Sequence, residues 1–340
     1  MAQHDHFISL LQVVQQKMDT LTPLYPINHQ LILIKGPDAK KFLQGQVTCD
    51  VDELDNTLST QTSAPLGAHC THKGRVVFSF RALQLPKNSS TSNEQIIALS
   101  VPQNIADIAV AALKKYSVFS KVDILPMSEE YQLLGMCGDD AYNRLLLLAD
   151  EHITVPTELN MAIHTSIGSI ICVAKNSYEL WLTKEQAQGM EGKITNILPA
   201  DNTYWHERTV KSGIASIYKD TSTLFTPHEM NYQQIGNAVS FKKGCYTGQE
   251  VVARMHYLGK LKKQLFLFEL ITAEDGTQVV SNGPLYIREK DQPVGTIIDV
   301  SKHQDHYYFL ASVVTDHAHT KDVFLDLAHQ HPVRLLTPDT

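Results

Sequence analysis

The pattern of apolar residues in this 340-residue sequence changes near residue 260. Before that point, apolar segments with strand character alternate with segments of helical spacing, and hairpin turns separate several of them. After it, short apolar segments follow one another, and turn sequences such as Ser281-Asn282-Gly283 lie between them. The first pattern predicts an α+β fold, and the second predicts a small β-barrel.

A second division of the chain falls just after residue 126. Residues 118–124 are predicted to form a strand shortly before it, and the segment that follows repeats the strand-and-helix order of the first without a repeat of individual residues. We therefore predict three units, namely an N-terminal α+β lobe over residues 1–126, a second α+β lobe over residues 127–258 and a C-terminal β-barrel over residues 259–340.

The charge and cysteine content restrict the class of protein. Lys plus Arg number 29 and Asp plus Glu number 36, for a formal net charge of −7, which argues against a dedicated duplex-binding protein. The five cysteines are widely separated and include no Cys-x-x-Cys pair, so they fit free thiols in a reducing compartment. The sequence shows neither a secretory signal pattern nor an apolar run long enough to span a membrane. We expect a cytoplasmic protein.

The residues from Lys242 to Gly248 are predicted to form a tight loop between a strand end and a helix. Gly244 and Gly248 permit turns that a Cβ would exclude, and apolar residues of helical spacing begin at Val251. Cys245 therefore lies just before a helix N-terminus, where the helix dipole and the nearby lysines favour thiolate over thiol. A reactive cysteine is one interpretation, and a small buried residue in a turn is the alternative.

The whole string Lys243-Gly244-Cys245-Tyr246-Thr247-Gly248-Gln249-Glu250 resembles the signature of the YgfZ-type folate-binding proteins. These are relatives of the glycine-cleavage T protein and are linked to iron–sulfur enzyme maintenance and tRNA modification. The resemblance implies a T-protein-like α+β fold, with two interleaved ferredoxin-like lobes and a small C-terminal β-barrel around a central channel. It implies tetrahydrofolate or a derivative as cofactor. It also implies iron–sulfur client enzymes, such as a tRNA methylthiotransferase, as partners.

The same resemblance suggests which residues bind the folate. Trp205 stands eight residues before Gly213, at the spacing of a tryptophan that lines the family's folate site. The family's second aromatic falls on His29, a departure that offers less stacking area. Glu179, in Tyr178-Glu179-Leu180, resembles a T-protein glutamate that binds the pterin edge. The alternative roles are a core aromatic for Trp205 and an edge-strand charge for Glu179.

Within the signature, Cys245 is the candidate reactive thiolate and Lys243 its cation, while Tyr246 and Glu250 are candidate cofactor-binding residues. Before the signature, Pro227-His228-Glu229-Met230-Asn231 resembles a family loop whose Glu and Asn shape the channel mouth. Helix capping is the alternative role for that pair.

The sequence is compatible with three functions. The first is a folate-binding accessory protein for iron–sulfur enzymes, which is not a classical enzyme. The second is a tetrahydrofolate-dependent aminomethyltransferase like the T protein, which requires a carboxylate beside the folate nitrogen. The T protein has an aspartate pair after an early glycine turn, whereas Arg75-Val76-Val77-Phe78 follows Gly74 here without an acid. The third is an interaction protein with a vestigial pocket.

Metal and nucleic-acid sites receive less support from the sequence. His-x-His pairs such as His317 and His319 lack further ligands at suitable spacing, so no metal is predicted. A single Cys245 thiolate cannot hold a cluster alone. The run Lys260, Lys262 and Lys263 is either a solvated strand edge or a contact for a folate glutamate tail or RNA phosphates, so direct nucleic-acid binding stays open.

Overall fold

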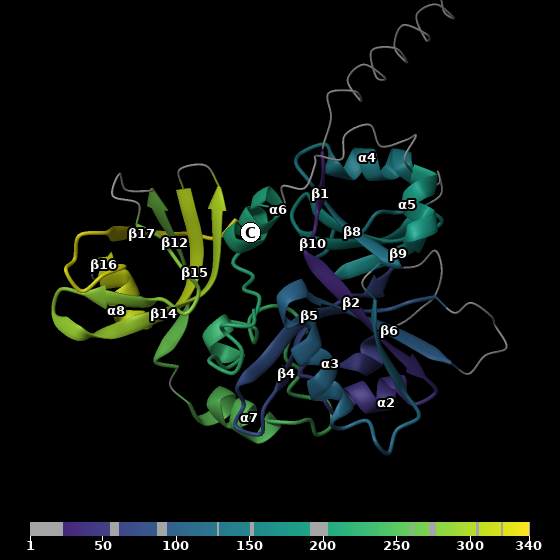
Figure 1. Cartoon of the computed structure of the whole chain (residues 1–340), viewed down its shortest axis with the longest axis horizontal. Coiled ribbons are helices and arrows are strands. Elements are labelled where there is room, and N and C mark those ends of the chain that lie inside the picture. Colours follow the sequence, from purple (N-terminus) through teal and green to yellow (C-terminus); the bar gives the residue numbers. More distant parts are fainter. Residues whose placement is uncertain are drawn as a thin grey trace, which may run out of the picture.

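The computed structural model (Figure 1) describes residues 23–54, 61–86, 94–127, 129–149, 153–190, 203–259, 261–271, 277–303, 306–320 and 322–339. These residues form a five-stranded sheet, a six-stranded sheet and a closed barrel. In Figure 1 the two sheets and their helices lie on one side and the barrel on the other, with α6 between them. The arrangement confirms the predicted α+β fold with a C-terminal barrel.

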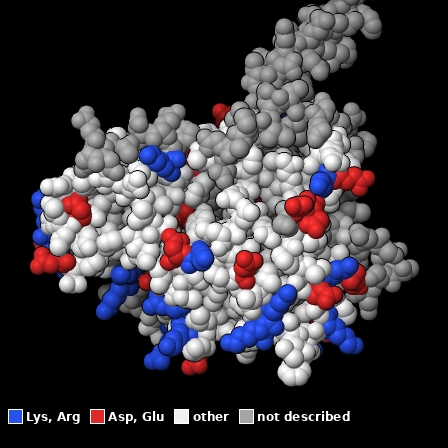
Figure 2. All heavy atoms as spheres, in the orientation of Figure 1, with Lys and Arg blue, Asp and Glu red and all other residues white. Residues whose placement is uncertain are grey.

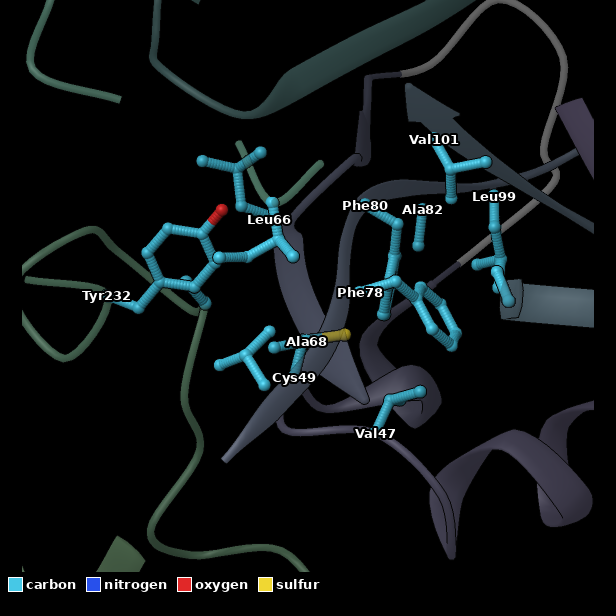
Figure 3. Close-up of a cluster of buried hydrophobic side chains, with 14 of the residues drawn as sticks. Val47, Cys49, Leu66, Ala68, Phe78, Phe80, Ala82, Leu99, Val101 and Tyr232 are labelled. Atoms are coloured by element: carbon cyan, nitrogen blue, oxygen red, sulfur yellow. The ribbon is translucent and has the colours of Figure 1, made fainter. Parts of the chain in front are cut away.

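The first sheet is antiparallel and has the strand order β4-β5-β6-β2-β7. Its strands are β2 (His29–Gly36), β4 (Leu66–Cys70), β5 (Val76–Gln84), β6 (Gln95–Pro102) and β7 (Asp123–Met127). The short helices of this lobe are α2 (Ala39–Gln44), η1 (Val51–Glu53), η2 (Gln103–Ile105) and α3 (Ala106–Lys114). Figure 3 shows part of the core on the helix-covered face, where Phe78 and Phe80 of β5 lie near Cys49, Ala68 and Tyr232.

The second sheet is also antiparallel and has the order β1-β8-β11-β10-β9-β3. Its strands are β1 (Leu24–Pro26), β3 (Thr62–Ser63), β8 (Tyr131–Cys137), β9 (Met161–Thr165), β10 (Gly168–Ala174) and β11 (Ser177–Thr183). The helices α4 (Ala141–Leu148) and α5 (Lys184–Met190) pack on its outer face through an apolar cluster.

The two lobes exchange strands. β1 pairs with β8, with Leu24 opposite Met136, and β3 pairs with β9, with Thr62 opposite Ala162. Both β1 and β3 precede residue 127, so the lobes are interleaved, as the fold class predicts. The division at residue 126 therefore separates two segments of the sequence, but the second sheet contains strands from both segments.

The inner faces of the two sheets share one apolar cluster, because strand side chains alternate between faces. In β2, Ile32 and Ile34 pack with the helix-covered core of the first lobe. Leu31 and Leu33 instead pack with Leu133 and other residues of the second sheet. The site described below lies at the edge of this shared layer.

The C-terminal residues form the predicted barrel, with the order β12-β15-β14-β13-β16-β17. Its elements are β12 (Lys263–Ile271), β13 (Pro284–Ile287), β14 (Lys290–His303), β15 (His306–Val314), α8 (Thr315–Thr320), β16 (Val323–Phe324) and β17 (Pro332–Leu336). Buried side chains such as Phe268, Leu285, Ile297 and Phe309 fill its interior, so the barrel is a packed core.

Three elements connect the lobes to the barrel, namely α6 (Thr203–Lys211), η3 (His228–Met230) and α7 (Gln249–Leu258). The helix α6 packs against β14 and β15 of the barrel and also contacts β1. Since α6 carries Trp205, the connection places the predicted folate residue between all three units.

One predicted strand is misplaced. Residues 118–122 form turns rather than a strand, with Val122 N–H bonded to Ser120 O and Ser120 N–H to Ser117 O. Val118 and Phe119 are exposed, and β7 begins only at Asp123. The apolar character of this segment therefore does not mark a buried strand. No helix within the described ranges is long and apolar enough to cross a membrane.

Candidate functional site

A cavity lies where the two sheets meet α6, and we call it the interlobe cavity. It leaves about 50 Å³ for the centre of a water-sized sphere, and part of the hollow is open to solvent. The first sheet contributes His29 and Arg81, the second sheet contributes Glu179, and α6 contributes Trp205 and Arg208. The cavity therefore brings together three residues that the resemblance assigns to folate, namely Trp205, Glu179 and His29.

Trp205 forms an aromatic wall because the strand beneath it carries a glycine. The Trp205 side chain is only 5% exposed. A Cβ built on Gly135 of β8 would lie 2.1 Å from Cε3 of the indole, so only glycine lets the ring lie this close. Gly135 is opposite Glu179 in the β8–β11 register. The ring and the carboxylate are thus anchored to neighbouring positions of one sheet.

Glu179 is a buried carboxylate with a fixed orientation. Its Oε2 accepts a hydrogen bond from Trp181 Nε1–H at 2.9 Å, and its Oε1 lies 3.9 Å from Arg81 Nε. The edge-strand role considered for Glu179 is not what the structure shows, because β11 lies between β8 and β10 and the side chain is 9% exposed.

Arg81 is the buried counter-charge of Glu179. Its Nη1 donates to Ala64 O at 2.8 Å and to Asn160 Oδ1 at 2.6 Å. Burial lowers the pKa of the guanidinium, and the Glu179 charge opposes that shift. Its Nε–H is buried and has no hydrogen-bond acceptor within the described ranges. Because a buried donor without an acceptor is costly, this atom is suited to an acceptor on a bound molecule.

His29 lines the cavity from β2 of the first sheet, whereas Glu179 lines it from the second sheet. Its Nδ1 is 3.0 Å from Ser100 Oγ. Burial, together with the charges of His206 and Arg81, lowers the pKa of His29 to about 4, and the Asp299 carboxylate opposes the shift. The imidazole is therefore neutral near pH 7 and adds no positive charge to the cavity.

A second hollow continues from the interlobe cavity towards the barrel and shares His29, Glu179 and Trp205 with it. At that end, His206 Nε2 lies 2.7 Å from Asp299 Oδ1 and 3.0 Å from the Tyr218 hydroxyl. Burial lowers the pKa of His206, but the charge and hydrogen bond of Asp299 outweigh burial and raise it overall. This pair joins α6 to the barrel strand β14.

The signature loop, residues 242–248, does not line the interlobe cavity. None of Lys243, Cys245, Tyr246 and Glu250 is among the described residues that line the interlobe cavity. Cys245 is exposed, as the reactive interpretation requires, and the small-buried-residue alternative does not hold for it. The chemical roles predicted for Cys245 and Glu250 stay predictions.

Lys243 and Tyr246 hold the signature loop in place. Lys243 Nζ donates to Val47 O at 2.8 Å and to Cys49 O at 2.7 Å, so its ammonium is bound to backbone carbonyls rather than reserved for a thiolate. Burial lowers the pKa of Lys243 to about 8. Tyr246 is buried, and its ring lies 5.3 Å from Lys243 Nζ.

Gly248 fixes the start of α7. Its φ of 85° is in the left-handed region, and a Cβ there would lie 2.4 Å from Thr71 O. Any larger residue would be strained and would push the loop away from the β4–β5 turn. The fold itself therefore requires glycine at position 248, where the loop ends and α7 begins.

Glu229 and Asn231 have structural roles and do not line the interlobe cavity. Glu229 Oε2 accepts hydrogen bonds from Thr226 and from Arg75 Nη1. Asn231 adopts a left-handed conformation with φ of 56°, and its side chain bonds both the N–H and the C=O of Leu265. The capping interpretation is thus closer to the structure than the channel-mouth interpretation.

Three further residues of the site, Arg81, His206 and Asp299, belong to no motif in the sequence. Arg81 had a usable signal, because an arginine within the apolar run of β5 needs a buried partner. His206 and Asp299 are 93 residues apart in sequence, and no local pattern links them. Among the described residues, no group of His, Cys, Asp and Glu is arranged to hold a metal ion.

Comparison with solved structures defines the class of fold. The chain is similar to the glycine cleavage system aminomethyltransferase T from Bartonella henselae, with a TM-score of 0.67 at 13% identity, over 93% of this chain and 84% of the other. At that identity the likeness concerns the fold alone. The protein therefore has the fold of the glycine-cleavage T protein.

Sequence comparison then identifies the family. The chain is 32% identical over 266 residues to the tRNA-modifying protein YgfZ of Photobacterium profundum, covering 77% of this chain and 74% of the relative. It is 31% identical over 260 residues to YgfZ of Vibrio atlanticus, covering 76% and 73%. No family model matches the sequence. The chain belongs to the family of the tRNA-modifying protein YgfZ.

Proposed function

We propose that this chain is a folate-binding accessory protein that supports iron–sulfur enzymes and, through them, tRNA modification. The observation that carries the proposal is the interlobe cavity, which is lined by Trp205, by the buried Glu179 carboxylate and by Arg81, whose Nε–H has no hydrogen-bond acceptor among the described residues. An aromatic wall with a few fixed polar groups is typical of sites for flat heterocycles.

The polar groups of the cavity match a pterin in chemistry. A pterin has an edge that carries N–H donors, and a carboxylate such as Glu179 accepts from such an edge. It also has ring acceptors, and Arg81 Nε–H is a donor that lacks an acceptor in the described part of the chain. Trp181 Nε1–H holds Glu179 in place at 2.9 Å. The residues of the cavity thus fit tetrahydrofolate or a derivative, which would supply a carrier for one-carbon groups when bound.

The same cavity does not favour aminomethyl transfer. Glu179 is the one carboxylate among the described residues that line it. Its Oε2 accepts from Trp181 Nε1–H at 2.9 Å and its Oε1 lies 3.9 Å from Arg81 Nε, so both contacts orient it as a hydrogen-bond acceptor. The turn from Thr71 to Gly74, where the T protein carries its acid, has none here. We therefore favour binding without classical catalysis.

The proposed link to iron–sulfur enzymes assigns the cluster to the client. Cys245 is the one exposed cysteine of the chain, and the other four are buried. A cluster held by cysteine thiolates needs several of them, so a single accessible sulfur is suited to contact with a client rather than to storage of a cluster. In this proposal tRNA modification depends on the client enzyme.

A titration of tetrahydrofolate into the full-length protein, followed by a methylene-transfer assay, tests the proposal. Tryptophan fluorescence should change saturably in the wild type. The change should be much smaller in Trp205→Phe, because the remaining Trp181 is 1% exposed and does not line the cavity, although it bonds to Glu179. Binding without transfer supports the accessory function, whereas turnover would support the aminomethyltransferase. Absence of binding would leave an interaction protein with a vestigial pocket.

A further inference from the structure

We infer that the exposed side of α7 is a docking surface for single-stranded nucleic acid. We call this surface the α7 face and define it by residues of α7, of the signature loop, of the β4–β5 turn and of the start of β12. Its members are Lys73, Phe241, Lys242, Arg254, His256, Tyr257 and Lys262. The inference is independent of the folate proposal, since none of these residues lines the interlobe cavity.

The first observation is an accumulation of positive charge. Lys73, Lys242, Arg254 and Lys262 are exposed, and none of them has a side-chain ion pair or hydrogen bond within the described part of the chain. Figure 2 shows Lys and Arg gathered along the lower edge of the molecule, where α7 lies in Figure 1. The chain as a whole has a net charge of −7. On α7 itself Glu250 is an exposed carboxylate, but the four cations outnumber it, so the local excess of positive charge is suited to a polyanionic partner.

These cations come from segments that are fixed relative to one another. The β4–β5 turn touches the first turn of α7, where a Cβ on Gly74 would lie 3.0 Å from Val251. The signature loop is tied to the first lobe by Ser240 N–H bonded to Thr48 O at 2.9 Å. Lys73, Lys242 and Arg254 therefore belong to one packed unit rather than to separate mobile segments.

The second observation is a group of aromatic rings among the cations. The rings of Phe241 and His256 are stacked, with centroids 3.8 Å apart and an interplanar angle of 16°. Tyr257 stands nearly perpendicular to both and is 67% exposed. His256 is also exposed. Exposed flat rings beside unpaired cations are the combination that binds unstacked bases and their phosphates.

An acidic protein is a less suitable occupant of this surface. Lysine is depleted in the desolvated core of protein interfaces, whereas Lys73, Lys242 and Lys262 make up most of the positive charge here. Among the described residues of α7, Leu258 is the one strongly exposed aliphatic side chain. Rings and cations thus dominate the α7 face, and a strand docked there would pass close to the signature loop that carries the exposed Cys245.

Fluorescence anisotropy of a labelled 15-nucleotide oligouridine with the full-length protein in about 50 mM salt tests the charge component. We expect saturable binding, weakened about tenfold or more by Arg254→Glu. The matched control is Lys184→Glu, which reverses an exposed charge on α5 of the other lobe and should change the Kd less than about twofold. If three or four phosphates are contacted, the logarithm of the binding constant should fall with that of salt with a slope of about −2 to −3.

The ring component is tested by His256→Ala and Tyr257→Ala. Each should weaken oligouridine binding about fivefold or more with little effect on the salt slope, because a base loses its stacking partner. Comparison with an oligothymidine of equal length shows whether the surface prefers RNA or DNA. Saturable binding of either oligonucleotide supports the inference. Three results would overturn it: no saturable binding at low salt, an equal loss with Lys184→Glu, or an oligoglutamate that binds as tightly as the oligonucleotide.

Discussion

The indole of Trp205 lies directly on Gly135, so that a methyl group added to Gly135 would come within 2.1 Å of an indole carbon. Gly135 is also opposite Glu179 in the neighbouring strand. A glycine on β8 thus decides whether α6 can bring an aromatic ring to the level of the buried carboxylate. The interlobe cavity depends on this close approach.

Gly135→Ala should therefore disturb both stability and the cavity. The added methyl must displace the Trp205 ring or the strand, and overpacking of this kind costs about 1–3 kcal/mol. We expect a lower melting temperature and an altered tryptophan emission spectrum. Gly189→Ala is the matched control, because nothing lies within 4 Å of its Cβ and alanine favours a helix. Equal effects of the two substitutions would contradict the packing described for Trp205.

Glu179→Gln tests the buried charge pair. Arg81 would lose its counter-charge while both side chains stay buried, and such a loss costs about 3 kcal/mol. The amide oxygen can still accept from Trp181 Nε1–H. We expect a clear decrease in the free energy of unfolding by urea, whereas Glu185→Gln on the exposed side of α5 should have little effect. A stability equal to that of the wild type would show that Arg81 does not depend on Glu179.

His228→Leu should change how stability depends on pH. Burial first and then the charge of His256 lower the pKa of His228 to about 4, from 6.5, and Glu229 opposes the shift. Between these values the unfolded chain binds more protons than the folded one, so stability falls as pH falls. At about pH 5 the loss attributable to His228 is about 2 kcal/mol.

The measurement is the free energy of unfolding between about pH 7 and pH 5. Both ring nitrogens of His228 are buried without hydrogen-bond partners, so leucine removes the titration without removing a contact of that kind. We expect a shallower pH dependence in His228→Leu. His72→Leu, at an exposed turn position, is the control. If the two variants have the same profile as the wild type, His228 is not the titrating group.

Much of the fold follows from sequence patterns, and the exceptions have physical reasons. The barrel and most strands of both lobes were predictable because their apolar residues alternate and turns separate them. β1 and β3 were not, because strands of 3 and 2 residues carry too little pattern to be distinguished from loops. Their pairing with the second sheet is what interleaves the lobes. Residues 118–122 were wrongly predicted to belong to a strand, because an exposed turn with apolar residues has the same sequence pattern as the start of a strand.

The candidate site was predictable only through the resemblance and only in part. Trp205, Glu179 and His29 come together, although they lie on different elements. The signature residues do not join them, because Lys243 bonds to the carbonyls of Val47 and Cys49 and thereby fixes the loop against the first lobe. Sequence spacing contains no information on such long-range backbone contacts. Lys260 of the predicted basic run lies outside the described residues.

Cys245 should be alkylated faster than the other four cysteines in the folded protein near neutral pH. It is exposed, whereas the others are buried. Burial raises the pKa of Cys49 and Cys70 to about 12 and that of Cys137 and Cys172 to about 11. Peptide mapping after brief exposure to iodoacetamide measures the rates. Denatured protein, in which all five should react alike, is the control, and equal rates in the folded protein would contradict the prediction.

Calorimetric titration of tetrahydrofolate tests the central claim, that the interlobe cavity is the folate site. Wild type should bind one equivalent. Trp205→Leu should weaken binding at least about tenfold, whereas Phe309→Leu, an equally buried aromatic in the barrel core, should bind as the wild type does. Unchanged affinity in a folded Trp205→Leu variant would contradict the claim.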